Sequence, residues 1–242
     1  EDKQFAEQPL LSPIYYIKKA LPDEHKTYID QLGTLLEKNI SILILPTFKK
    51  INQKSIEKIY GWIENGGLLI RFADSRIINN NTKLITSRDN YKTIRDLGGR
   101  LSLNEDIRLS NFKKNSIYSN INIPLDVEIK KQLVLNIKED QNTKILSSLT
   151  DGTPIISSKK IGDGKIVLFH FTANNEWSNI PISKLFVDLL SKTLLMKEIK
   201  KVDSTGEIYL ESVINAFGQL KETSKKVTIS HSDQLKEIIP SY

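Results

Sequence analysis

Two short apolar runs separated by an amphipathic segment, all within residues 40–73, constrain the fold of this chain more than any other feature. The first run, 40–45, is almost wholly apolar, as in a strand that is covered on both faces of a sheet. Apolar residues then recur at helical spacing, at Ile56, Ile59, Tyr60 and Ile63. Gly66 and Gly67 end this helix, and a second buried run follows over 68–73. The order predicts a parallel β-α-β unit, because a crossover helix joins neighbouring parallel strands.

The rest of the chain supplies elements of both kinds. A β-hairpin is expected at 153–158 and 165–171, because Gly162-Asp163-Gly164 forms a turn between two β-prone runs. Residues 75–150 are less regular and predict short strands. The expected helices are 14–21, which stops near Pro22, then 25–38, the helix that follows an N-cap at Asn52, 181–196, and a short helix near 210–217.

Together these elements predict an α/β protein, a three-layer α/β/α sandwich with a mostly parallel sheet. The domain is expected over 13–200, with a β-rich insertion at about 100–150. The polar residues 1–12 are interpreted as an N-terminal linker and 201–242 as a C-terminal extension and linker. Because folds of this kind open with a strand and 1–12 do not supply one, we expect the first strand to precede this segment.

Composition excludes several classes of site. The chain of 242 residues contains no cysteine, so a disulfide scaffold, a thiolate zinc site and a cysteine nucleophile are excluded. Three histidines without ligand spacing do not indicate a metal, and no cofactor is expected. The net charge of +6 comes from lysines spread among acidic residues, which argues against a nucleic-acid partner. No apolar run approaches the ~20 residues of a membrane helix.

Arginine is distributed differently from lysine. All six arginines lie within one window, at Arg71, Arg76, Arg88, Arg95, Arg100 and Arg108. A guanidinium group offers a rigid fork for carboxylate or phosphate that lysine cannot copy. Two explanations stay open: the arginines pair internally with nearby acidic residues, or they form a surface for an anionic ligand or a partner.

Five local motifs are shared with one family of proteins. They are QPLLSPIYY at 8–16, WIENGGLLIRFA at 62–73, RDLGGRLS at 95–102, DGTP at 151–154, and LFHFTA followed by WSNIPIS and LFV within 168–187. Over about residues 8–220, the chain resembles the middle region of alphaproteobacterial inner-membrane proteins that have a double-transmembrane, aerotolerance-regulator (BatA-like) N-terminus. It departs from them at Leu103, where relatives tend to carry tryptophan. The resemblance implies an extramembrane, periplasmic segment of an inner-membrane-associated protein.

The predicted fold also resembles class I glutamine amidotransferases. Those enzymes place a cysteine nucleophile on a tight turn after one strand and a His-x-Glu sequence after a later strand. Here Ala73-Asp74-Ser75 and His170-Phe171-Thr172 occupy these places. The resemblance therefore implies that the histidine is kept while its nucleophile and orienting carboxylate are gone, and a triad needs all three groups.

Topology predicts where a site would lie. Ligands in open α/β sheets bind beyond the carboxyl ends of strands. If the strands at 68–73 and 165–171 are neighbours, one crevice receives the candidate ligand-binding residues Arg71, Asp74, Arg76, His170 and Thr172, and Arg95 is a further candidate. His170 is interpreted as a hydrogen-bonded core histidine, with proton transfer as the alternative. Ser75 is the candidate substitute nucleophile.

These features favour a non-catalytic, amidotransferase-like binding or scaffold module of a larger envelope-associated membrane protein. Its expected partners are other domains of that protein or envelope proteins. The alternative is a hydrolase with a relocated site near His170, acting on envelope amide or glycan bonds. That alternative predicts a serine or carboxylate within about 3 Å of the His170 ring. A structural spacer without any pocket is a third possibility.

Overall fold

The computed structural model of this protein describes residues 9–22, 26–47, 51–79, 84–86, 92–98 and 107–197, with four short strands between 208 and 227. The chain divides into two compact units, Glu1–Glu198 and Ile199–Tyr242. Among the residues described, no helix is both long enough and apolar enough to cross a membrane.

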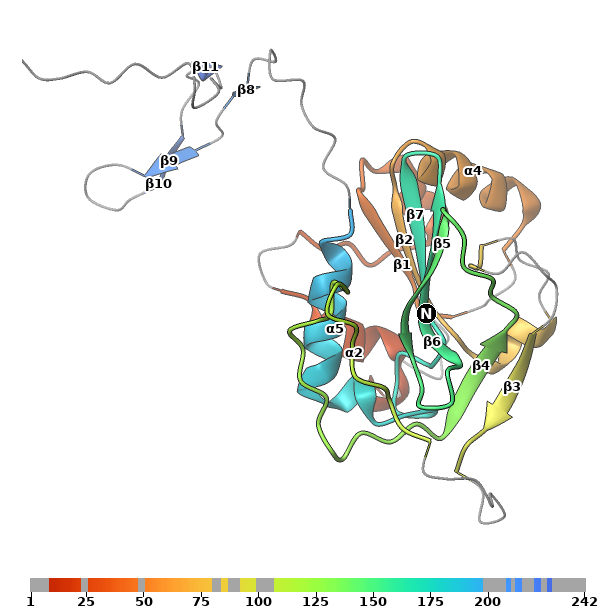
Figure 1. Ribbon diagram of the computed structural model, residues 1–242. Helices are drawn as coiled ribbons and strands as arrows, with labels where there is room; N and C mark the ends of the chain where they lie inside the picture. Colours follow the sequence, from red (N-terminus) through yellow and green to blue (C-terminus); the bar gives the residue numbers. More distant parts are fainter. Residues whose placement is uncertain are drawn as a thin grey trace, which may run out of the picture. The chain divides into compact units, whose positions relative to one another are not determined.

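A five-stranded sheet forms the centre of the first unit (Figure 1). In spatial order its strands are β1 (Ile42–Leu45), β2 (Leu68–Phe72), β7 (Gly164–Phe169), β6 (Pro154–Ile161) and β5 (Thr143–Ser148). β2 is parallel to both of its neighbours, whereas β6 is antiparallel to both of its own. Four strands therefore run in one direction, which confirms the mostly parallel sheet of an α/β protein.

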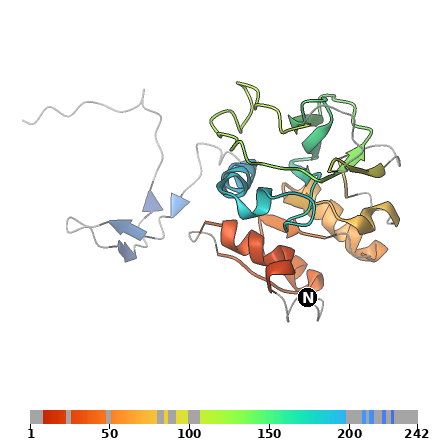
Figure 2. The same ribbon diagram turned by 90° about the horizontal axis from the view of Figure 1, so that it is seen from below.

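Helices pack on both faces of this sheet (Figures 1 and 2). On one face lie α2 (Pro13–Ala20) and α5 (Lys184–Leu194), over a core cluster that includes Ile70 and Phe72. On the other lies α4 (Gln53–Glu64), over a second cluster that includes Leu69. Alternate residues of β2 thus serve opposite clusters, as the two-residue period of a strand requires.

The β-α-β unit forms as the sequence predicts. Asn52 caps α4, because its side-chain oxygen accepts a hydrogen bond of 2.8 Å from the backbone N–H of Ser55. Gly66 follows the helix with a φ of 100°, a left-handed conformation that glycine adopts without strain. The chain then enters β2, which pairs with β1 in parallel. The predicted hairpin is also confirmed, since β6 and β7 are antiparallel neighbours joined through Gly162.

The helix predicted at 25–38 is wrong over its first half. Only α3 (Leu32–Glu37) is helical, and residues 26–31 have no regular secondary structure, while residues 23–25 lie outside the described part. Tyr28 and Ile29 are 42% and 54% exposed, although the predicted helix would have buried Ile29. The Asp30 side chain accepts a hydrogen bond from the backbone N–H of Gln31, the N-cap residue of α3.

The predicted insertion at about 100–150 is divided between two places. β3 (Lys92–Asp96) and β4 (Lys131–Leu135) form a separate antiparallel ribbon, and the described residues between them are turns and irregular chain. β5 falls inside the same range but joins the central sheet as an edge strand. Figure 1 shows the ribbon lying beside the end of β6.

The second unit contains two short antiparallel strand pairs. β8 (Ile208–Tyr209) pairs with β11 (Lys226–Val227), and β9 (Ser212–Ile214) pairs with β10 (Leu220–Glu222). The short helix predicted near 210–217 is therefore wrong where this region is described. Two of the three residues of β9 are β-branched, and such side chains favour strands over helices.

Candidate functional site

His170 lies directly after β7, and its imidazole ring is fully buried. Nδ1 is 2.8 Å from the backbone oxygen of Leu133 on β4, and Nε2 is 2.7 Å from Oγ of Ser157 on β6. A carbonyl oxygen can only accept, so Nδ1 carries the proton of the neutral ring. The Ser157 hydroxyl therefore donates to Nε2.

Thr86 extends this arrangement by one further side chain. Its Oγ1 lies 2.7 Å from the Ser157 oxygen. Because the Ser157 hydrogen is directed at His170, the Thr86 hydroxyl is the donor of this second bond. Thr86 and Ser157 are both 0% exposed. The Thr86–Ser157–His170–Leu133 chain thus joins the segment 84–86 to β6, β7 and β4.

Burial sets the charge state of the His170 ring. Desolvation lowers its pKa to about 4, against the smaller opposing effect of the bond to the Leu133 carbonyl. The ring is therefore neutral at physiological pH, with both nitrogens in hydrogen bonds. The serine that a relocated hydrolase site requires within about 3 Å is present, and it is Ser157 rather than Ser75.

Arg71 is the second buried member of the predicted site. It lies in β2, fully buried, and its guanidinium donates to the backbone oxygens of Leu84 (3.2 Å) and Thr47 (3.4 Å). Desolvation lowers its pKa to about 9, and the charge of Asp74 acts in the opposite direction. The side chain stays charged at neutral pH and holds two separate chain segments over the sheet.

Asp74 and Arg76 bind each other at the end of β2. Oδ2 of Asp74 accepts from Nε and Nη2 of Arg76 at 3.0 and 2.8 Å, and Oδ1 accepts from the Arg76 backbone N–H at 2.8 Å. The pair fixes the start of the 3₁₀ helix η2 (Ser75–Asn79). Ser75 itself is exposed there, whereas His170 is buried against other partners.

Arg95 and Thr172 make contacts of a similarly internal kind. The Arg95 guanidinium donates to Asp151 at 2.7 Å, to Gln132 at 2.7 Å and to Thr153 at 3.0 Å. Thr172 stabilises the turn that follows β7, because its Oγ1 donates to the Asn174 backbone oxygen and accepts from the Trp177 N–H. Of the other arginines, Arg88 and Arg100 lie outside the described residues.

The structure brings part of the predicted site together. β2 and β7 are neighbours, as the prediction requires, and Arg71 pairs with Leu168 in their register. Arg71 and His170 therefore lie on the same face of the sheet, because residues two apart on a strand share a face. The segment 84–86 covers both, through the Leu84 carbonyl and the Thr86 hydroxyl. Their role in binding an anion stays a prediction.

Sequence reasoning missed Ser157 and Thr86. A signal for the first existed, because Ser157 interrupts the apolar start of a strand that the sequence predicts correctly. In the hairpin register Ser157 faces Leu168, which places it diagonally from His170 on the same face. No signal pointed to Thr86, since it belongs to no predicted element.

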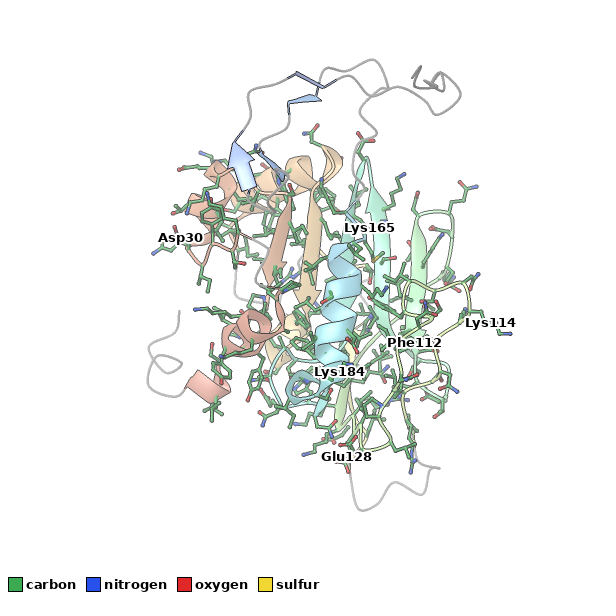
Figure 3. All side chains as sticks on the ribbon, turned by 90° about the vertical axis from the view of Figure 1, so that its left-hand side faces the viewer. Asp30, Phe112, Lys114, Glu128, Lys165 and Lys184 are labelled. Atoms are coloured by element: carbon green, nitrogen blue, oxygen red, sulfur yellow. The ribbon has the colours of Figure 1, made fainter. Side chains whose placement is uncertain are left out.

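Sequence reasoning also missed a cavity of about 480 Å³ along the free edge of β1. Its lining includes residues 40–46 and residues 26–30. α2, the residue that follows it and α3 add Ile14, Ile17, Leu21, Leu32 and Leu35. We call this cavity the β1 groove. Figure 3 shows Asp30 on this side of the sheet, opposite the side that carries Phe112 and Lys114.

The described residues contain no cluster of histidine and acidic side chains able to hold a metal ion. The volume of the β1 groove falls within the range of roughly 300–1,000 Å³ that is typical of ligand pockets, and its lining is mostly apolar.

Comparison with known proteins supports a shared fold only. No protein-family model matches the chain, and no curated protein matches its sequence. The chain is similar in structure to the cytoplasmic protein STM1381 from Salmonella typhimurium LT2, with a TM-score of 0.50 and 11% identity over 71% of this chain and 77% of the other. For the cytoplasmic protein STM3548 from Salmonella typhimurium the TM-score is 0.47, with 13% identity over 71% and 76% of the two chains.

A weaker likeness is to part of a glycosidase. The exo-beta-1,4-mannosidase Op5Man5 from Opitutaceae bacterium strain TAV5 gives a TM-score of 0.36 and 13% identity, over 64% of this chain and 25% of the mannosidase. At such identities the likeness to STM1381 shows a common fold, and nothing about activity follows from any of the three.

Proposed function

We propose that this chain is a non-catalytic binding module, with a class I glutamine amidotransferase-like sandwich, within a larger envelope-associated membrane protein. The fold proposal is supported by the mostly parallel sheet with helices on both faces. It is also supported by the turn after β2, where Asp74 and Ser75 stand in the place of the nucleophile of those enzymes.

One observation carries the non-catalytic role. The His170 ring is fully buried, and each of its nitrogens already has a hydrogen-bond partner. A general base must reach the proton of a reacting group, either directly or through one water. The only hydroxyl hydrogen-bonded to the ring in the described structure is that of Ser157, which is itself buried beneath Thr86. The β1 groove, by contrast, is a ligand-sized space with a mostly apolar lining.

A hydrolase is the second candidate, because Ser157 and His170 have the geometry of a nucleophile and its base. Their 2.7 Å contact resembles the hydroxyl–imidazole pair of serine hydrolases, and the Leu133 carbonyl orients the ring in place of a carboxylate. For catalysis, Thr86 would have to leave and a carbonyl carbon would have to reach the Ser157 oxygen. The reaction would then be acyl transfer on an amide of the envelope.

A fluorophosphonate probe tests the choice between these two roles. Such probes phosphonylate serines whose hydroxyl is activated by a neighbouring histidine. We expect no labelled Ser157 when the chain is incubated with the probe and digested for mass spectrometry. Labelling that disappears in Ser157→Ala but persists in Ser75→Ala would overturn the binding-module proposal and establish the hydrolase.

The proposed location is the periplasmic side of the inner membrane, and the proposed partners are other domains of the same protein or envelope proteins. The support is the set of five motifs shared with the BatA-like membrane proteins. Fusions of the larger protein, cut after the residue that corresponds to Tyr242 and joined there to alkaline phosphatase or to green fluorescent protein, test the location. Phosphatase activity without fluorescence is the expected result, and the reverse pattern contradicts the proposal.

A further inference from the structure

The free edge of β1 presents backbone groups to the β1 groove. β1 pairs only with β2 among the described residues. The N–H of Leu68 donates to the oxygen of Ser41, so the backbone groups of Ser41 and, two residues on, of Leu43 point toward β2. By the same alternation the N–H and C=O groups of Ile42 and Ile44 point away from β2, into the groove.

The walls of the groove suit one added strand. Neighbouring strands lie about 4.8 Å apart, and the four residues of β1 give an edge roughly 13 Å long. Residues 26–30 contribute to the lining of the same groove. An extended peptide in this groove would complete the hydrogen bonds of Ile42 and Ile44. A lipid tail or a helix would leave them unmet.

Both faces of such a strand would be covered by apolar side chains. On one face lie Ile17 of α2 and Leu21 directly after it, and on the other Leu32 and Leu35 of α3. A strand covered on both faces carries a continuous apolar run rather than an alternating pattern. The groove therefore selects about four to six consecutive apolar residues, the usual length of a short strand.

Charged side chains in the groove lining determine which residues should lie beside the apolar run of the bound peptide. Lys18 and Lys26 line the groove, and neither forms an ion pair with a described residue. The acidic member of the lining, Asp30, is already bound to Lys38 at 3.2 Å. Two lysines against one aspartate leave the lining with a formal net charge of +1, which favours acidic residues beside the apolar run. Two copies of this chain joined edge to edge would instead bring their lysines together, which is unfavourable.

We propose that the β1 groove binds an extended apolar segment with acidic flanks, from a partner protein, as a sixth strand hydrogen-bonded to β1. Strand addition of this kind obtains affinity from the backbone and specificity from the side-chain pockets. The inference rests on the proposed binding role and gives that role a partner chemistry.

The test begins with a phage-displayed library of random peptides of about twelve residues, selected on the 242-residue chain. We expect the selected sequences to contain an apolar run with Asp or Glu beside it. The best synthetic peptide is then compared with two N-methylated copies. One copy is methylated on the first, third and later odd backbone nitrogens of the apolar run, and the other on the even ones. One of the two methylated copies should bind more than tenfold more weakly, since it lacks the donors for the β1 carbonyls.

Lys18→Glu and Lys19→Glu form a matched pair, because both lysines are exposed in the last turn of α2 and only Lys18 lines the groove. Lys18→Glu should weaken peptide binding about fivefold to tenfold, and Lys19→Glu by less than twofold. Equal effects of the two variants, full binding of both methylated peptides, or no selected peptide would each overturn the strand proposal.

Failure here remains distinguishable from failure of the binding role. If no peptide is selected and Ser157 is not phosphonylated, the strand site is refuted and the non-catalytic role stands. A phosphonylated Ser157 removes that role whatever the peptides do.

Discussion

The hydroxyl of Ser157 donates a 2.7 Å hydrogen bond to Nε2 of His170, and both side chains are completely buried. The same two residue types in the same contact serve as nucleophile and base in open active sites. Here the pair joins β6 to the end of β7 and continues to Thr86 on one side and Leu133 on the other. Burial, rather than the identity of the residues, decides between the two roles.

Removing the Ser157 hydroxyl should destabilise the fold. Ser157→Ala leaves Nε2 of His170 as a buried acceptor without a donor and takes away the acceptor for Thr86. We expect a loss of about 1–3 kcal/mol in the free energy of unfolding, measured by urea denaturation. Ser75→Ala is the control, since Ser75 is exposed, and should change stability by less than about 0.5 kcal/mol. Equal stability of the two variants would contradict a structural role for Ser157.

His170 should make the protein sensitive to mild acid. Its pKa is lowered from 6.5 to about 4 by burial, so the unfolded chain binds this proton more readily than the folded one. Stability should therefore fall as the pH drops from about 6.5 to about 4, by up to roughly 3 kcal/mol. Urea midpoints at several pH values measure this slope. His170→Asn should flatten it within that window, and an unchanged slope in the variant would assign the effect to other groups.

Arg71 should be sensitive to the type of replacement. Arg71→Met removes a buried charge along with the donors to Leu84 and Thr47, and we expect it to cost about 1–3 kcal/mol. Arg71→Lys keeps a buried charge but loses the planar fork that reaches two carbonyls, so it should be the more destabilising of the two. Thermal unfolding ranks the variants. A lysine variant as stable as the parent chain would show that the fork is not needed.

Two glycines should respond oppositely to alanine. A Cβ at Gly164 would overlap the carbonyl oxygens of Ile63 and Gly67, where α4 and the start of β2 approach β7. Gly164→Ala should therefore cost about 3 kcal/mol or more. Gly61, inside α4, has open space around it, and Gly61→Ala should stabilise the helix by about 0.5–1 kcal/mol. Chemical denaturation measures both, and a tolerated Gly164→Ala would contradict the close approach.

The central sheet could be predicted because its information is local. The run at 40–45, the spacing of Ile56 and Ile63, and the turn at Gly162 each define an element within a few residues. The lack of a helix at 26–31 could not be predicted in this way, since Ile29 and Leu32 have helical spacing although Ile29 is exposed in the structure. The place of β5 in the sheet likewise depends on its pairing with β6, which no local pattern contains.

For the candidate site, only the strands that carry its residues could be predicted. Arg71 and His170 are predicted to share one crevice because the ends of neighbouring parallel strands meet at one edge of a sheet. What sequence reasoning could not give is the cover over them, which comes from Leu84 and Thr86. The pairing of Arg95 with Asp151 joins residues far apart in the chain and depends on how the β3–β4 ribbon packs.

Three consecutive residues, Leu84 to Thr86, each contact a different region of the first unit. Leu84 packs against the α4 cluster and accepts from Arg71, Ile85 packs in the larger cluster, and Thr86 binds Ser157. If this segment opens, a guanidinium and a serine–histidine pair lose partners in one event. We therefore expect the ends of β2 and β7 and the segment 84–86 to open as one cooperative unit, with amides that exchange together in native-state hydrogen exchange.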